Sequence, residues 1–77
     1  MPKKRKLLPE DARILFGSKL RVFRQRRGLS QEKLSFEAGL DRSYVGGVER
    51  GERNIALLNI FKLARALKVH PKELLDV

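Results

Sequence analysis

The segment from Gly28 to Gly51, GLSQEKLSFEAGLDRSYVGGVERG, predicts two short helices joined by a tight turn. Ser30 is placed to cap the first helix, in which Leu34 and Ala38 form an apolar stripe at i, i+4. Gly39 supplies the positive φ that a sharp turn needs.

The second helix of this segment has an apolar side and a polar leading end. Asp41 is placed to cap it, and Val45 and Val48 are predicted to point inward. A helix that fits the major groove of DNA and begins with polar side chains can read base edges. We therefore predict base contacts from its first turn: Arg42, Ser43 and Tyr44.

These three side chains differ in what they can do. Arg42 is the best base reader, because a guanidinium can fork onto guanine O6 and N7. Ser43 suits either a base or a phosphate. Tyr44 suits a phosphate through its hydroxyl and a sugar or thymine methyl through its ring, and a half-buried packing role is the alternative.

The same segment resembles the helix-turn-helix of the phage repressor and Cro family. The pattern is Gly28-Leu29-Ser30-Gln31-x-x-Leu34, then Ala38-Gly39-Leu40, then Tyr44-Val45-x-x-Val48-Glu49-Arg50-Gly51. The resemblance covers residues 17–75. Within the family it is most similar to the small controller proteins of restriction–modification systems, through Glu49-Arg50-Gly51-Glu52-Arg53-Asn54-Ile55 and Leu58-Asn59-Ile60. It implies an all-α fold, a five-helix repressor-like bundle with a helix-turn-helix motif.

The resemblance also implies which residues touch the DNA backbone. The expected phosphate contacts are Gln31, Arg50, Arg53, Asn54, Asn59 and Arg24. Gln31 is further expected to buttress the recognition helix. Arg24 has two interpretations, a buried pair with Glu49 that ties the first helix to the recognition helix, or a direct DNA contact. The pair is favoured, because such pairs fix geometry more reliably than they add stability.

Charge is distributed unevenly along the 77 residues, whose formal net charge is +9. Residues 1–27 hold ten Lys and Arg against two acids, and residues 28–77 hold eight against seven. Such asymmetry favours a polyanionic partner, which is double-stranded DNA or, as the alternative, an anionic membrane surface. The first ten residues have too short an apolar run for a secretory signal, and no run is long enough to span a membrane, so we expect a cytoplasmic protein without a membrane partner.

We expect a basic mobile arm over residues 1–9 and a single helix-turn-helix domain over residues 10–77. The arm carries Lys3, Lys4, Arg5 and Lys6, which suit a phosphate or minor-groove contact. A solvated tail is an equal alternative, and nuclear localisation is a weaker one. Helices are expected over residues 10–27, 31–37, 42–50 and 57–68, with a short last helix from Pro71, where His70 acts as a cap or a surface residue.

The expected fourth helix is apolar on more than one side, which indicates that one face closes the core and the other needs a partner. The economical partner is a second copy of the chain. The residues assigned to this dimer seam are Leu57, Ile60, Leu74, Leu75 and Val77. Ala56 cannot cap this helix, so its start is weakened or is capped by Asn54.

Gly46 and Gly47 lie inside the expected recognition helix, where each glycine costs about 1 kcal/mol relative to alanine. Close approach to DNA, close approach to a neighbouring helix, and tolerated drift are three explanations that the sequence leaves open.

The leading hypothesis is a sequence-specific, homodimeric DNA-binding regulator on an inverted repeat, which controls its own gene within a restriction–modification system. RNA polymerase is a further partner if the protein activates a promoter, and no small-molecule ligand is expected. The alternative is an antitoxin-type protein that binds a toxin and represses its own operon. An enzyme is not expected, since the chain has one His, no Cys, no phosphate-cradling loop and no carboxylate pair, and it offers no cofactor or metal site.

Overall fold

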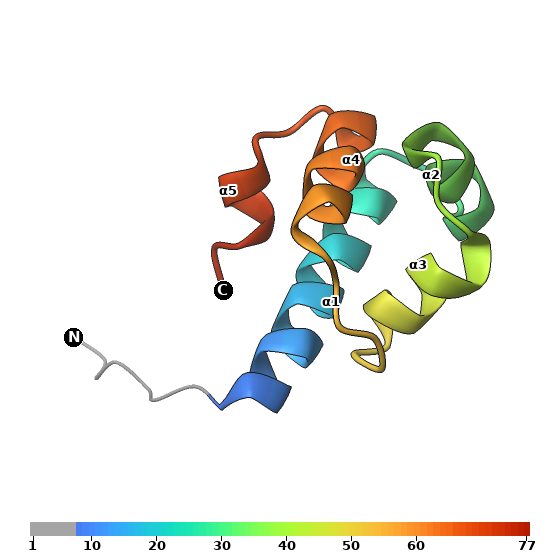
Figure 1. Cartoon of the computed structure of the whole chain (residues 1–77). Coiled ribbons are helices and arrows are strands. Elements are labelled where there is room, and N and C mark those ends of the chain that lie inside the picture. The colour runs from blue at the N-terminus through green and yellow to red at the C-terminus, as the bar shows by residue number, and fades with distance from the viewer. Residues whose placement is uncertain (1–7) are drawn as a thin grey trace.

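The computed structural model describes residues 8–77, which form five helices and no strand. They are α1 (Pro9–Arg26), α2 (Gln31–Ala38), α3 (Arg42–Glu49), α4 (Leu57–Leu67) and α5 (Pro71–Leu74) (Figure 1). The expected all-α architecture is confirmed, and the ends given for the first four helices were each right to within one residue. The basic cluster of the expected arm, from Lys3 to Lys6, lies outside the described residues.

The helix ends follow from local chemistry. The Ser30 hydroxyl accepts a hydrogen bond from the Lys33 amide at 3.0 Å, and the Asp41 carboxylate accepts one from the Ser43 amide at 3.1 Å. Gly39 takes φ 71°, the left-handed conformation that ends α2 and turns the chain into α3. At α5, the His70 Nδ1 accepts from the Lys72 amide at 3.1 Å, so His70 is a capping residue. The predicted caps of α2, α3 and α5 are therefore confirmed.

The start of α4 lacks the kind of side-chain cap that begins α2, α3 and α5. Ala56 makes no capping hydrogen bond, and no hydrogen bond from Asn54 replaces it within the described residues. Instead, the Tyr44 hydroxyl on α3 accepts from the Ala56 amide at 3.4 Å and from the Asn59 side-chain amide at 3.0 Å. A tertiary contact thus supports this helix start.

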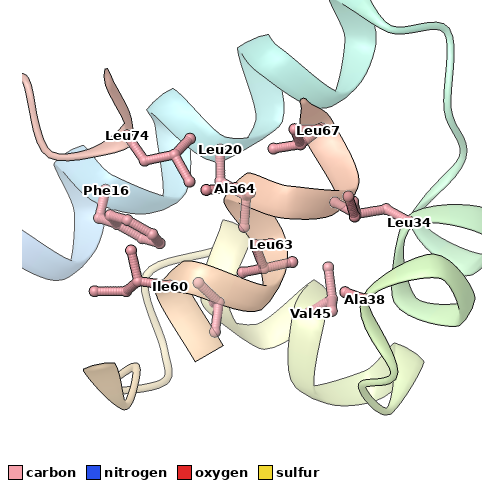
Figure 2. Packing of buried hydrophobic residues seen from close by; sticks show 12 residues of the cluster. Phe16, Leu20, Leu34, Ala38, Val45, Ile60, Leu63, Ala64, Leu67 and Leu74 are labelled. Atoms are coloured by element: carbon pink, nitrogen blue, oxygen red, sulfur yellow. The ribbon is translucent and has the colours of Figure 1, made fainter. Parts of the chain in front are cut away.

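Every helix contributes to one apolar core, shown in Figure 2. Leu20 on α1, Leu34 on α2, Val45 on α3 and Leu63 on α4 have no exposed surface. Figure 2 shows Leu74 reaching from α5 toward Leu20, and Phe16 facing Ile60 across the same core. The full buried set is Phe16, Leu20, Leu34, Ala38, Val45, Val48, Ile60, Leu63, Ala64, Ala66, Leu67 and Leu74.

The close packing of α1 against α3 depends on Gly17. A Cβ placed on Gly17 would overlap the Val48 carbonyl oxygen and lie 2.6 Å from the Glu49 carbonyl oxygen. Any larger residue would therefore push the two helices apart. This contact fixes the position of the C-terminal half of α3 on the body of the protein.

Candidate nucleic-acid interface

The C-terminal end of α3 is held by a partly buried polar cluster, which we call the Glu49 clamp (Arg24, Gln31 and Glu49). The Arg24 guanidinium donates to both Glu49 carboxylate oxygens, at 2.6 Å from Nε and 3.0 Å from Nη2. Gln31 donates its side-chain amide to Glu49 Oε1 at 2.9 Å, and Arg24 Nη1 donates to the Leu29 carbonyl at 2.8 Å. The clamp therefore joins α1, α2 and α3.

The clamp settles the two interpretations of Arg24. Its side chain is 12% exposed and that of Glu49 is 2% exposed, so the pair is largely shielded from water. The structural pair is confirmed. Arg24 is removed from the set of phosphate contacts, because its guanidinium nitrogens are already committed to Glu49 and Leu29. Gln31 buttresses α3 as expected, and its contact with phosphate stays a prediction.

The N-terminal end of α3 is open to solvent. Arg42 and Ser43 are exposed, and within residues 8–77 the Arg42 guanidinium makes no ion pair. Asp41 caps the helix through the Ser43 amide, and the Ser43 hydroxyl also donates to the Asp41 carboxylate. This hydroxyl bond is the main cause that holds the pKa of Asp41 below its ordinary value. Desolvation opposes it, and the amides of Ser43 and Tyr44 and the charge of Arg53 add to the lowering.

Tyr44 is a half-buried residue that packs against the start of α4. Its hydroxyl accepts from Asn59, so these two predicted DNA contacts are bonded to each other at 3.0 Å. The Arg53 guanidinium carbon lies 5.9 Å from the centre of the Tyr44 ring, within the range of a cation–π contact. The packing role of Tyr44 is therefore present, whereas its base contact and the phosphate contact of Asn59 stay predictions.

The loop between α3 and α4 carries the remaining predicted phosphate contacts. Gly51 takes φ 77° and ends α3 as expected. Arg50, Arg53 and Asn54 are all exposed. Arg50 pairs with Glu52 at 3.1 Å, but both side chains are about three-fifths exposed, so this pair does not prevent Arg50 from turning to a phosphate.

The predicted dimer seam is corrected by burial. Leu74 has no exposed surface and Ile60 is 7% exposed, so both belong to the core of the subunit and cannot contribute a contact surface. Leu57, Leu75 and Val77 are more than half exposed. Two residues that the sequence analysis did not assign to the seam lie beside Leu57 on α4, namely Leu58 at 71% and Phe61 at 54% exposed.

The signal for these two missed residues was present in the sequence. Leu57, Leu58 and Phe61 are spaced at i, i+1 and i+4, which places them on one side of a helix. Ile60, Leu63, Ala64 and Leu67 form the other side, and the structure shows all four of them buried. Both sets of residues are apolar and lie next to each other around the same helix. The sequence alone therefore does not tell which set faces the core, because that depends on where the neighbouring helices pack.

Residues 8–77 contain no group of three or more His, Cys, Asp or Glu side chains placed to hold a metal ion. None of the helices in this part is both long enough and apolar enough to cross a bilayer.

The fold and this surface define a helix-turn-helix module with a fixed recognition helix and a basic loop. The helix-turn-helix family model matches residues 20–74, and the chain belongs to this family. Control protein C.BamHI of Bacillus amyloliquefaciens is 49% identical over 70 residues, which are 90% of this chain and 86% of that protein. The chain is a DNA-binding transcription regulator and resembles the controller proteins of restriction–modification systems.

Solved structures agree with this placement. The restriction–modification controller protein C.AhdI from Aeromonas hydrophila has a TM-score of 0.78 and 62% identity, over 79% of this chain and 92% of that one. SinR, a master regulator for biofilm formation solved in complex with DNA, has a TM-score of 0.76 and 29% identity, over 79% of this chain and 98% of that one.

Proposed function

We propose that two copies of this chain form a homodimer that binds an inverted-repeat operator and controls the genes of a restriction–modification system, its own gene included. The observation that carries the proposal is the contrast within α3, whose Glu49 end is clamped while its Arg42 end is exposed. A recognition helix anchored in this way presents its first turn to the major groove in a fixed orientation.

The DNA contacts follow from where the exposed polar groups lie. Arg42 and Ser43, at the open end of α3, are the proposed base readers. Arg50, Arg53 and Asn54, in the loop at its other end, are the proposed phosphate contacts that set the register of docking. Each arginine that contacts a phosphate strengthens binding through counterion release, and the net charge of +9 favours association with a polyanion.

The dimer is supported by an exposed apolar face on α4, which we call the α4 face (Leu57, Leu58 and Phe61). These side chains are 67%, 71% and 54% exposed. The adjacent helix α5, which packs beside α4 (Figure 1), is followed by Leu75, which is 53% exposed. Apolar groups gathered in this way are typical of a protein–protein contact. A second copy is the proposed occupant, because an inverted repeat requires two-fold symmetry.

The controller role rests on relatives. C.BamHI is a control protein and C.AhdI is a restriction–modification controller protein. If this chain acts in the same way, its operator lies upstream of its own gene. Occupation of that operator then depends on protein concentration through dimerisation.

The first experiment is selection of bound duplexes from a random DNA pool at moderate salt, followed by sequencing. We expect an enriched inverted repeat with half-sites about 34 Å apart or a multiple of that spacing. A match to this repeat upstream of the chain's own gene supports autoregulation. Binding without enrichment, which fades as salt rises, rejects sequence-specific regulation, and a stable complex with the product of a neighbouring gene would then favour the antitoxin role.

The dimer has its own test. Phe61→Glu should convert the dimer to a monomer in analytical ultracentrifugation, because it places a charge in the apolar seam. Phe36→Glu is the matched control, since Phe36 is a 79% exposed phenylalanine on α2 and is not part of the α4 face. A Phe61→Glu protein that sediments as the wild type does would exclude the α4 face as the seam.

A further inference from the structure

The glycine pair inside α3 lies beneath two arginine side chains. A Cβ added to Gly47 would lie 2.6 Å from Arg53 Cγ, 3.4 Å from its Nε and 3.6 Å from its Cδ. A Cβ added to Gly46 would lie 3.2 Å from Arg50 Nη1 and 3.4 Å from Gln31 Oε1. The stem of Arg53 therefore rests along the backbone of α3 at Gly47, whereas only the tips of side chains approach Gly46.

The rest of the Arg53 side chain is directed back along α3 toward its open end. Its guanidinium lies over the Tyr44 ring, one turn before Gly47. Its charge also helps to lower the pKa of the Asp41 carboxyl, at the N-terminus of the helix. Tyr44 is held in turn by its bond to Asn59. The loop is held at its start, because the Glu52 amide donates to the Gly47 carbonyl at 2.9 Å.

We propose that Gly47 is a positioning residue for the contact of Arg53 with DNA. The seat exists only because residue 47 lacks a side chain. Arg53 Cγ is close to the backbone, so an overlap there cannot be relieved by moving the tip and forces the whole side chain into another rotamer. The proposal rests on the proposed function, since it concerns a residue assigned to the DNA contact.

Tolerated drift, the competing explanation of the glycine pair, makes the opposite prediction. Alanine is the better helix former at both positions. If the glycines have no role, Ala at residue 47 should stabilise the protein and leave DNA binding unchanged. If Gly47 seats Arg53, the same substitution should stabilise the protein and weaken its binding. A gain in stability with a loss of binding is a result that a merely structural role of Gly47 does not produce.

The test is a double-mutant cycle on the operator recovered by selection, with Gly47→Ala, Arg53→Ala, the double variant, and Gly46→Ala as the matched control. We expect Arg53→Ala to weaken binding about tenfold, because it removes a charge-assisted contact with a phosphate. Gly47→Ala should weaken it about three- to tenfold, but change it less than about twofold once Arg53 is already Ala. Gly46→Ala should bind within about twofold of the wild type, because only the exposed tip of Arg50 has to move, and Gln31 Oε1 at 3.4 Å is already at an ordinary contact distance.

Melting followed by circular dichroism checks the fold of each variant. Gly46→Ala and Gly47→Ala are expected to melt at or above the wild-type temperature. The inference is overturned if Gly47→Ala binds the operator as tightly as the wild type. It is also overturned if Gly47→Ala weakens binding by the same factor in the Arg53→Ala variant as in the wild type. A wild-type protein that enriches no DNA sequence would instead reject the proposed function, and the inference with it.

Discussion

The two ends of α3 are built in opposite ways. At the C-terminal end, the Glu49 side chain is 2% exposed and bonded to Arg24 and Gln31, and Gly17 brings the backbone of α1 into direct contact. At the N-terminal end, Arg42 and Ser43 are exposed, and a single cap from Asp41 holds the first turn. The C-terminal end is therefore part of the protein's interior, and the N-terminal end is part of its surface.

This difference indicates how a short helix can act as a rigid reader. The eight residues of α3 are too few to be stable as a helix in isolation. The clamp and the close approach at Gly17 supply tertiary support at one end, which fixes the direction of the helix axis. At the other end, the Arg42 guanidinium makes no ion pair within residues 8–77, while Ser43 and Tyr44 keep hydrogen bonds to Asp41 and Asn59. Substitutions should accordingly affect stability at the Glu49 end and DNA recognition at the Arg42 end.

The largest expected effect is at the clamp. Glu49→Ala removes the partner of a largely buried guanidinium and should lower the free energy of unfolding by about 3–5 kcal/mol, measured by urea denaturation. Such a loss is a large fraction of the stability of a small domain. As control, Arg24→Met combined with Glu49→Leu should restore much of it, since an apolar pair leaves no uncompensated charge. A loss below about 1 kcal/mol for Glu49→Ala would mean that the pair contributes no more than an exposed ion pair does, and that it does not stabilise the position of α3.

The second effect tests the close packing of α1 against the Glu49 end of α3, without changing a charge. Gly17→Ala should lower the free energy of unfolding by about 1–3 kcal/mol, because its Cβ overlaps the backbone of α3. Ser18→Ala is the matched control on the exposed side of α1 and should change stability by less than about 0.5 kcal/mol. If Gly17→Ala were as stable as Ser18→Ala, α1 would not pack against α3 as closely as the structure has it.

The third effect belongs to the open end. Arg42→Ala should leave the melting temperature unchanged but reduce discrimination between the operator and a single-base variant by about 1–3 kcal/mol. The measurement is the ratio of dissociation constants for the two duplexes at fixed salt. Equal losses on operator and random DNA would assign Arg42 to phosphate binding and remove it from base reading.

Sequence reasoning was reliable where a single residue type decides the outcome. Ser30 and Asp41 cap, and Gly39 takes positive φ, because few other residues do these things well. Such caps and the apolar periodicity together placed the ends of the first four helices to within one residue. The pairing of Arg24 with Glu49, 25 residues away, came from the family resemblance, and local patterns alone do not predict it.

Sequence reasoning failed where the outcome depends on the arrangement of several helices. The predicted seam residues Ile60, Leu74, Leu57 and Leu75 are all apolar, yet only Leu57 and Leu75 are exposed. Ile60 and Leu74 are buried because they lie in the core that the helices form together. The close approach at Gly17 and the bond between Tyr44 and Asn59 are likewise tertiary contacts that no periodicity indicates. The glycine pair remained ambiguous because Arg53, the residue that rests on Gly47, comes from a different segment.

The smallest expected effect tests the cap at the open end. The pKa of Asp41 in the folded protein lies below its ordinary value of 3.8, so the ionised carboxylate favours the folded state. This contribution is fully present above the unfolded pKa and is lost as the pH falls through 3.8 toward the folded pKa. Asp41→Asn keeps a good N-cap acceptor but has no group that titrates. Melting temperatures measured from neutral pH to below 3 should therefore fall less steeply for Asp41→Asn than for the wild type, with the two curves similar at neutral pH. Parallel curves over the acid range would show that the open end gains nothing from the charge of Asp41, and that the backbone hydrogen bonds alone hold the first turn of α3.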